Sequence, residues 1–197
     1  MLDSNFFNRP TLEVASDLLG KVIVRNGVKA VIVETEAYIG PVDKGCHAYH
    51  FKKTKRNEVM FSCGGVAYLY LIYGMYYCLN FVTEGEGFPC AVLIRSVEVV
   101  EGLDTACRRR YKKEYSQLSS RQIRNLSNGP GKVCMLFNLS SAQNGMSLQT
   151  DDMYIEDNGI SGFDIVKAKR INIDYAEEAR DFLWRFYIKG NQNISVK

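Results

Sequence analysis

Lys21-Val-Ile-Val-Arg-Asn-Gly-Val-Lys-Ala-Val-Ile-Val-Glu-Thr-Glu-Ala-Tyr38 is the stretch of sequence that decides the fold. Residues 21–25 and 30–37 are apolar and rich in β-branched side chains, which favour strands. Asn26-Gly27 lies between them, and this pair is typical of a two-residue hairpin turn, because both positions need a positive φ. The sequence therefore predicts an antiparallel hairpin whose second strand enters a buried sheet.

More strands than helices are predicted around this hairpin. Further strands are expected at residues 66–73, 76–82, 90–97, 153–156, 163–169 and 184–189. Helices are expected at residues 11–19, 99–113, 130–137 and 174–183, with Asp174 as the cap of the last one and Glu177 three residues on. We therefore expect an α+β fold with a mainly antiparallel mixed sheet, flanking helices and a protruding β-hairpin. No repeat or linker divides the chain, so residues 1–197 are expected to form a single domain.

Composition limits the class of protein. The 197 residues are 46% hydrophobic and 24% charged, which are globular values. The first residues, MLDSNFFNRP, do not resemble a signal peptide, and no apolar run approaches the ~18 residues of a membrane span. We therefore expect an intracellular protein with no membrane partner. The six cysteines include no CxxC pair and there are two histidines, so no metal site is expected and most thiols should be free core residues.

Basic residues are clustered although the net charge is only +3. Two clusters stand out, Lys52-Lys53 with Lys55-Arg56, and Arg108-Arg109-Arg110 with Lys112-Lys113. Clustered basic side chains can neutralise phosphates and release counterions. The alternative is a solvated charged surface.

Acidic side chains end the second strand of the hairpin. Alternate residues of a strand share a face, so Glu34, Glu36 and Tyr38 are predicted to lie together. A carboxylate at the end of a buried strand can be partly desolvated, which suits a general base. The alternative is a glutamate that faces solvent.

Tyrosines crowd the segment Tyr68-Leu-Tyr-Leu-Ile-Tyr-Gly-Met-Tyr-Tyr77. Tyr68 and Tyr70 share a face, and Tyr73 precedes Gly74, where the chain is expected to reverse. Aromatic rings stack on nucleic-acid bases and can wedge between base pairs. The alternative is that tyrosines simply favour strands.

Polar residues interrupt two other apolar strands. Asn80 lies within Cys78-Leu-Asn-Phe-Val82, and a buried amide needs a backbone or ligand partner. Arg95 follows Ala91-Val-Leu-Ile, and Glu36 is its expected acidic partner, for structure or for chemistry. Asn128-Gly-Pro-Gly-Lys132 is not a Walker A motif; its glycines either bring backbone to a ligand or form a plain turn.

Together these segments resemble the 3-methyladenine DNA glycosylase family of the alkyladenine type. The matching strings, in family order, are VETEAYIGPVDKGCHA, TKRNEVMF, GGVAYLYLIYGMYYCLN, AVLIRSVE and NGPGKV, with a weaker match through AKRINI and RFYIKG. The resemblance implies a fold like the formyltransferase C-terminal domain. It also implies a base-excision repair enzyme that flips alkylated or deaminated purines out of double-stranded DNA. The enzyme would hydrolyse the N-glycosidic bond and leave an abasic site, as a monomer without a cofactor.

The resemblance also assigns roles to single residues. Catalysis would fall to Glu36 as the base that activates water, with Arg95 and the main chain of Ile171 holding that water. The purine would be bound by Ala37, Tyr38, His47, Tyr68, Tyr70 and Asn80, with Ala37 and His47 at the base edge and Asn80 rejecting guanine. DNA would be bound by Thr54, Arg56, Tyr73 and Met75, with Tyr73 intercalated. No lysine matches a family nucleophile, so Schiff-base strand cleavage is not implied.

Three positions depart from the family pattern. Cys63-Gly-Gly65 replaces a proline-containing turn, Val99 stands where proline is common, and Asn172 replaces a common glycine. The last change falls in the segment that is expected to hold the water.

Two other functions remain open. The first is a non-catalytic nucleic-acid-binding domain of the formyltransferase C-terminal type. The second is a nucleosidase that acts on free nucleosides. A paired Glu36 and Arg95 argue against the first, and an exposed tip tyrosine with basic clusters argues against the second.

Overall fold

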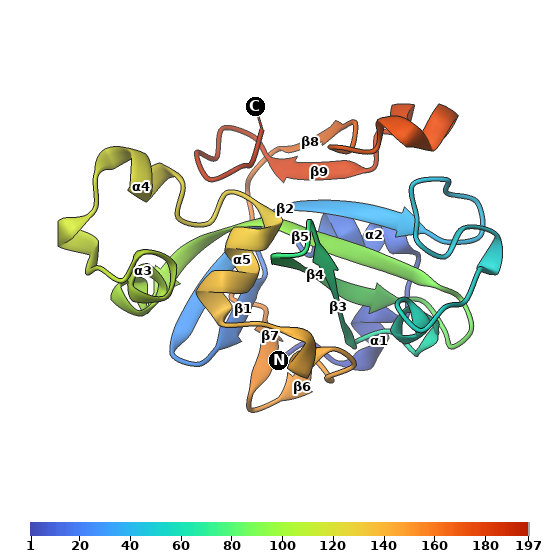
Figure 1. Cartoon of the computed structure of the whole chain (residues 1–197), viewed down its shortest axis with the longest axis horizontal. Helices are drawn as coiled ribbons and strands as arrows, with labels where there is room; N and C mark the ends of the chain where they lie inside the picture. The colour runs from blue at the N-terminus through green and yellow to red at the C-terminus, as the bar shows by residue number, and fades with distance from the viewer. Residues whose placement is uncertain (197) are drawn as a thin grey trace.

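A computed structural model describes residues 1–196 and shows one curled antiparallel sheet with short helices around it (Figure 1). In the described residues, the sheet has nine strands in the order β3-β4-β5-β2-β1-β7-β6, and β9 pairs with both β2 and β8. The strands are β1 Val22–Arg25, β2 Val28–Ile39, β3 Ala67–Ile72, β4 Tyr76–Thr83, β5 Cys90–Glu101, β6 Gln149–Thr150, β7 Met153–Glu156, β8 Ile165–Ala168 and β9 Arg185–Ile188. The α+β class and the mainly antiparallel sheet are as the sequence predicts.

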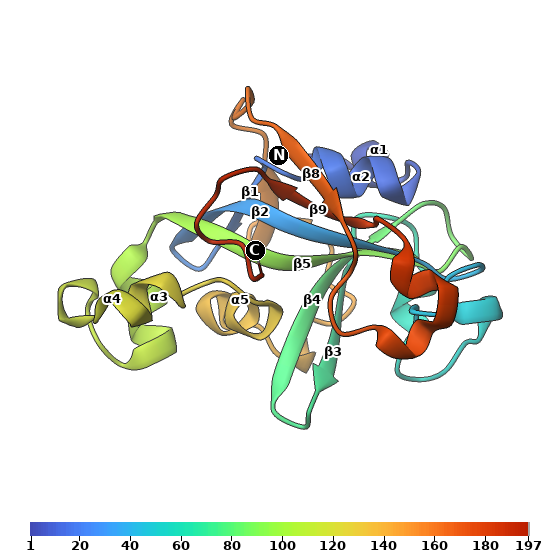
Figure 2. The ribbon, with the colours of Figure 1, turned by 90° about the horizontal axis from the view of Figure 1, so that it is seen from above.

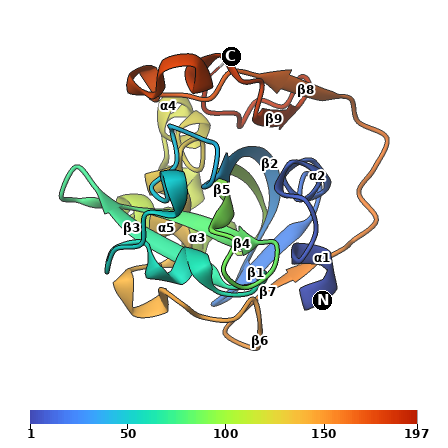
Figure 3. The ribbon, with the colours of Figure 1, turned by 90° about the vertical axis from the view of Figure 1, so that its right-hand side faces the viewer.

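The helices are short. The α-helices are α1 Ser4–Phe7, α2 Thr11–Asp17, α3 Leu103–Tyr111, α4 Ser120–Arg124 and α5 Pro130–Phe137. The 3₁₀ segments are η1 Tyr49–Phe51, η2 Glu58–Phe61, η3 Tyr115–Gln117, η4 Ser141–Gln143 and η5 Asp174–Asp181. Figures 2 and 3 show α2 and α5 on opposite sides of the sheet around β5, and the main hydrophobic core lies between these layers.

The β1–β2 hairpin forms as its turn predicts. Asn26 and Gly27 have φ values of 47° and 74°, and Arg25 pairs with Val28 across the turn. β2 is then bordered on both edges, because β5 pairs with it over most of its length while β1 and β9 share the other edge. Its side chains are buried on both faces up to Ala37 apart from a half-buried Lys29. A central strand of this kind can hold carboxylates away from bulk water.

Two predicted helices are wrong in part. β5 continues to Glu101 because Val99 and Glu101 pair with β2, so the following helix begins only at Leu103, after Gly102 turns the chain with a φ of 76°. Val99, where the resemblance led us to expect proline, is thus a strand residue. The predicted helix 174–183 is the 3₁₀ segment η5, which Glu177 interrupts with a φ of 48°, and Asp174 makes no capping hydrogen bond.

The β3–β4 hairpin extends from the body of the molecule, with α5 on one side and η5 on the other (Figure 2). Its register pairs Tyr68 with Asn80 and Ile72 with Tyr76. Tyr73 and Gly74 at the tip both have positive φ, at 52° and 68°. A positive φ is uncommon for tyrosine, and such local strain is often kept at functional sites.

Candidate active site

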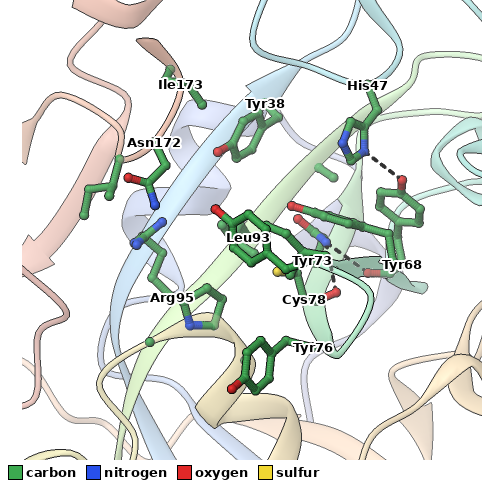
Figure 4. A pocket seen from close by; sticks show the side chains of 18 of the residues that line it. Tyr38, His47, Tyr68, Tyr73, Tyr76, Cys78, Leu93, Arg95, Asn172 and Ile173 are labelled. Atoms are coloured by element: carbon green, nitrogen blue, oxygen red, sulfur yellow. Dashed lines mark hydrogen bonds between the residues drawn. The ribbon is translucent and has the colours of Figure 1, made fainter. Parts of the chain in front are cut away.

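A cavity of ≈ 650 Å³ opens between the β3–β4 hairpin, α5, the loop after β2 and the segment after β8 (Figure 4). Nine of the residues to which the resemblance assigned a role line it: Tyr38, His47, Arg56, Tyr68, Tyr70, Tyr73, Asn80, Arg95 and Ile171. These residues span more than 130 positions of the chain, so only the curled sheet brings them together.

Glu36 lies directly behind one wall of this cavity and is fully buried. Its Oε1 accepts a hydrogen bond from the Ile171 backbone N–H at 2.8 Å and lies 3.3 Å from Arg95 Nη1. Its Oε2 accepts the Tyr38 hydroxyl at 2.8 Å. Burial and the nearby Glu36 raise the pKa of Tyr38, so this hydroxyl stays protonated and remains a donor. The three partners line the cavity, and they fix the carboxylate at its edge.

Arg95 is shared between two buried carboxylates. Besides Glu36, its Nε lies 3.6 Å from Glu34 Oε1 and donates to the Ser195 hydroxyl at 3.2 Å. Burial alone would lower the pKa of Arg95, but Glu36 and Glu34 outweigh it and raise that pKa. Glu34 in turn accepts hydrogen bonds from Arg185 and from the backbone and side chain of Ser195. Tertiary structure thus places Glu34, which the sequence assigned only to the shared face, behind the site.

Asn172 lies in the segment after β8, at the position where the resemblance led us to expect glycine. Asn172 has a φ of 60°, in the left-handed region that glycine adopts freely. Asparagine enters this region more readily than other residues with a side chain. The replacement of glycine therefore remains compatible with the contact between Ile171 N–H and Glu36.

Three aromatic side chains form another wall of the cavity. His47 Nδ1 lies 3.0 Å from the Tyr68 hydroxyl (Figure 4). The His47 and Tyr70 rings meet edge to face, with their centres 4.5 Å apart. Burial and the nearby Arg56 lower the pKa of His47 to about 4. The imidazole is therefore neutral at pH 7, with one nitrogen a donor and the other an acceptor.

Asn80 is 3% exposed and lies on the floor of the cavity. Its Nδ2 donates to the Tyr68 carbonyl at 3.1 Å and to the Cys78 carbonyl at 3.4 Å. The amide is therefore held rigidly by backbone while it also borders the space that a ligand would fill. This position is compatible with both interpretations from the sequence, an amide that bonds backbone and an amide that contacts a ligand.

The tip of the β3–β4 hairpin is exposed and apolar. Tyr73 is 72% exposed and Met75 is 66% exposed, and Tyr76 beside them is partly exposed and lines the cavity mouth. Packing within this chain does not explain such side chains, so they are available to a partner.

The two basic clusters differ in the structure. Lys52, Lys53, Lys55 and Arg56 are all exposed, and Arg56 stacks over Tyr70 at the cavity. In the second cluster, Arg109 and Arg110 donate mainly to backbone carbonyls, and Arg108 pairs with Glu114. The first cluster is therefore the better candidate for phosphate contacts. Thr54 beside it is exposed, but its backbone N–H and hydroxyl both bond Asn57 Oδ1.

Ala37 is not where the resemblance implied. Its side chain is buried in the main core, its N–H donates to Trp184 and its carbonyl accepts from Arg170. Side chains alternate between the two faces of β2, so Ala37 lies on the face opposite to Glu36 and Tyr38. Gly45, which lies in the polar loop after β2, lines the cavity instead.

Further residues line the cavity without having been assigned a role in the site from the sequence. Tyr76, Cys78 and Leu93 line the cavity, and so does the turn 129–132 before and at the start of α5. The alternation of β4 and β5 was the available signal, because Cys78 and Asn80 share a face, as do Leu93 and Arg95. For 129–132, the reading in which glycines bring backbone to a ligand site fits the structure better than a plain turn.

Among residues 1–196, no group of three or more His, Cys, Asp or Glu side chains could hold a metal ion. None of the helices in the described part of the chain is both long enough and apolar enough to cross a membrane. Five of the six cysteines are buried, and Cys63 is exposed.

The cavity has aromatic walls, lies beside a buried glutamate and arginine and is close to an exposed aromatic hairpin tip, an arrangement that fits a DNA glycosylase. Residues 5–192 match the family model described as methylpurine-DNA glycosylase (MPG), and the chain belongs to this family. It is therefore a hydrolase of DNA repair, in the base-excision repair of alkylation damage.

Curated relatives are similar in sequence to this chain over nearly their whole length. A protein of Alkaliphilus oremlandii is 53% identical over 200 residues, which cover 100% of this chain and 99% of the relative. A protein of Clostridium perfringens is 50% identical, with the same coverage. One from Desulfitobacterium hafniense is 47% identical and covers 100% and 98%. All three carry the name "Putative 3-methyladenine DNA glycosylase".

Proposed function

We propose that this enzyme removes alkylated and deaminated purines from double-stranded DNA by a glutamate-assisted hydrolysis. The substrates would be of the 3-methyladenine, 7-methylguanine, hypoxanthine and ethenoadenine class. The observation that carries the proposal is Glu36, fully buried and fixed by three groups that line an aromatic cavity. A domain that only bound nucleic acid would need no such buried carboxylate.

The proposed chemistry uses one water molecule. Its oxygen attacks C1′ of the deoxyribose, the N-glycosidic bond breaks, and the purine leaves with the bonding electrons. Glu36 takes the proton from the water, since a general base must lie within hydrogen-bond reach of that proton. Arg95 and the backbone of Ile171 hold Glu36 in place and border the space where the water would lie.

The proposed purine site is the aromatic part of the cavity. Tyr38 on one side and Tyr70 with His47 on the other supply faces and edges against which a flat base can stack. Neutral His47 can hydrogen-bond the base edge. Asn80, held by two backbone carbonyls, would clash with the 2-amino group of guanine and so reject it.

DNA binding and base flipping are proposed for the face that carries the hairpin tip. Tyr73 would fill the gap that the extruded nucleotide leaves, with Met75 beside it. Arg56 and Thr54, in the exposed basic segment, would meet phosphates. The enzyme would act as a monomer in the compartment that holds the DNA.

Hydrolysis without a lysine nucleophile is proposed for this site, because the resemblance implies no such lysine. Lys132 lines the cavity, but its ammonium group donates three hydrogen bonds to Asn125 and Asn128. A Schiff-base nucleophile needs a free amine, so hydrolysis to an abasic site is the proposed end of the reaction.

The test is base release from defined duplexes. Oligonucleotides that carry one hypoxanthine, ethenoadenine or 7-methylguanine are incubated with the enzyme and then treated with alkali, which cleaves abasic sites. Cleavage at the lesion, with none in the undamaged duplex, is the expected result. Cleavage before alkali would indicate lyase activity. Release from free nucleosides but not from duplex would favour a nucleosidase.

A further inference from the structure

Arg170 is a buried cation that the proposed chemistry does not use. Its side chain is fully buried and forms an ion pair with Asp43, which is also fully buried, through contacts of 2.5 and 2.8 Å. The same guanidinium donates to the Ala37 carbonyl at 3.0 Å and to the Ala179 carbonyl at 3.1 Å. Four hydrogen bonds to three separate segments are more than a simple ion pair requires.

Two of these partners lie close in sequence to residues that line the cavity, because Ala37 precedes Tyr38 and Asp43 lies two residues before Gly45. The guanidinium lies 4.7 Å from the centre of the Tyr38 ring. Tyr38 lines the cavity and Arg170 does not, so the cation lies behind this ring. The residue after Arg170 is Ile171, whose N–H bonds Glu36.

Asp43 extends the connection to the loop that carries His47. Its Oδ1 accepts the Gly45 N–H at 2.8 Å, and its carbonyl accepts the Cys46 N–H. Gly45 is packed closely against the pair, because a Cβ there would lie 3.1 Å from Asp43 Oδ1 and 3.3 Å from Arg170 Nη2. Gly45 and His47 both line the cavity.

We propose that Arg170, through Asp43, is a positioning residue that sets the distance between the purine walls and the catalytic edge of the cavity. Its buried contacts connect the Tyr38 ring, the Gly45–His47 loop and the Ile171 segment. In this role it contacts neither the purine nor the attacking water. The inference rests on the proposed function of the cavity. Arginine suits this place because its planar fork holds a carboxylate and two carbonyls at fixed angles, which a lysine ammonium cannot do.

Misplaced walls should affect purines unequally. A purine alkylated at N7, such as 7-methylguanine, is cationic and leaves readily without much help. Hypoxanthine is neutral and depends on exact placement against the pocket and the base. A displacement of about 1 Å can cost about 100-fold in rate. Loss of Arg170 should therefore lower hypoxanthine release far more than 7-methylguanine release.

The experiment measures this ratio under single-turnover conditions, with enzyme in excess over duplex. Arg170→Met is compared with Arg25→Met, a matched control from the β1–β2 hairpin. Arg25 is also buried, pairs with Asp152 and donates to the carbonyls of Phe137 and Asp152, but it does not line the cavity. Active fractions are matched by the amount of folded protein, so loss of stability alone cannot change the ratio.

A second variant removes the risk that Arg170→Met does not fold. Arg170→Met/Asp43→Asn leaves no unpaired buried charge, and breaking a buried pair on one side is what destabilises most. The asparagine keeps an oxygen for the Gly45 N–H. This variant should be more stable than Arg170→Met, although the carbonyls of Ala37 and Ala179 still lose their donor, and it should keep the catalytic defect.

The expected result is a fall of about 100-fold in hypoxanthine release against less than about fivefold for 7-methylguanine, in both Arg170 variants. Arg25→Met should leave the ratio of the two rates unchanged. Equal losses on both purines, or full recovery of hypoxanthine release in the double variant, would overturn the positioning role. Failure of the wild-type enzyme to release either purine would instead refute the proposed function.

Discussion

Glu36→Gln should lose most of its activity and little stability, whereas Glu34→Gln should lose stability and keep most of its activity. The two glutamates are two residues apart on one strand, both are fully buried, and both lie within 3.6 Å of Arg95. Only Glu36 is proposed as the base. The comparison therefore separates loss of chemistry from loss of a buried charge.

The expected stabilities follow from the hydrogen-bond partners. In Glu36→Gln the new amide nitrogen can replace Oε2, which faces the Tyr38 hydroxyl, and a hydroxyl can turn from donor to acceptor. The retained oxygen still accepts from Ile171 and Arg95 keeps Glu34 as a carboxylate partner, so the cost should be smaller than in Glu34→Gln. In Glu34→Gln an amide nitrogen in either place faces an N–H that cannot turn, from Arg185 or Ser195. That conflict should cost about 2–3 kcal/mol.

The expected activities run the other way. Loss of a general base lowers the rate by about 10²–10⁴-fold, so Glu36→Gln should release hypoxanthine that much more slowly in single turnover. Glu34→Gln should stay within about tenfold of wild type at matched folded fraction, because Arg95 keeps Glu36 as its partner. Urea denaturation gives the stabilities. Near-wild-type release by Glu36→Gln would refute its role as base. A larger stability loss in Glu36→Gln than in Glu34→Gln would refute the hydrogen-bond reasoning.

Four other predictions concern single features. The pKa of His47 is lowered from 6.5 to about 4, so the unfolded state binds the proton first and stability is lost as pH falls from 6.5 towards 4. The loss of stability is at most about 3 kcal/mol. In His47→Gln, the stability measured by urea denaturation should vary less with pH over this range. Identical pH profiles for the variant and the wild type would contradict the prediction. Tyr73→Ser at the exposed tip should change stability by less than about 0.5 kcal/mol but weaken binding to a duplex with an abasic-site analogue. Unchanged binding would remove the wedge role. Asn80→Ser should raise release of guanine, especially from mispairs, while hypoxanthine release changes little; a parallel fall in both would make Asn80 purely structural. Activity should persist in excess chelator, and loss that zinc or magnesium restores would show a metal requirement.

The strands were predictable where local signals were strong. Asn26-Gly27 needs no tertiary contact to favour its turn, and the tyrosine hairpin has a reversal at Gly74. The errors fell where local signals were ambiguous. Arginine-rich residues after Val99 look helical, but pairing with β2 keeps Val99–Glu101 in the sheet. A long-range strand pair thus outweighed local helix propensity.

The candidate site was predictable in its residue types and only partly in its arrangement. Tyr38, His47, Tyr70, Asn80 and Arg95 line the cavity as expected. Ala37 does not, although the alternation of β2 already implied it.

The sequence by itself determined the α+β class, the central hairpin and the family, because β-branched runs, Asn-Gly and the long ETEAY and YGM strings are local properties of the chain. Only the tertiary structure decided that Glu34 and Ser195 lie behind Arg95, and that Arg170 and Asp43 form a buried pair behind Tyr38. Ser195 lies 100 positions from Arg95 and 161 from Glu34, and Arg170 lies 127 positions from Asp43. No periodicity encodes such a contact, since it depends on how the curled sheet folds the segment after β8 back against β2 and removes both charges from water.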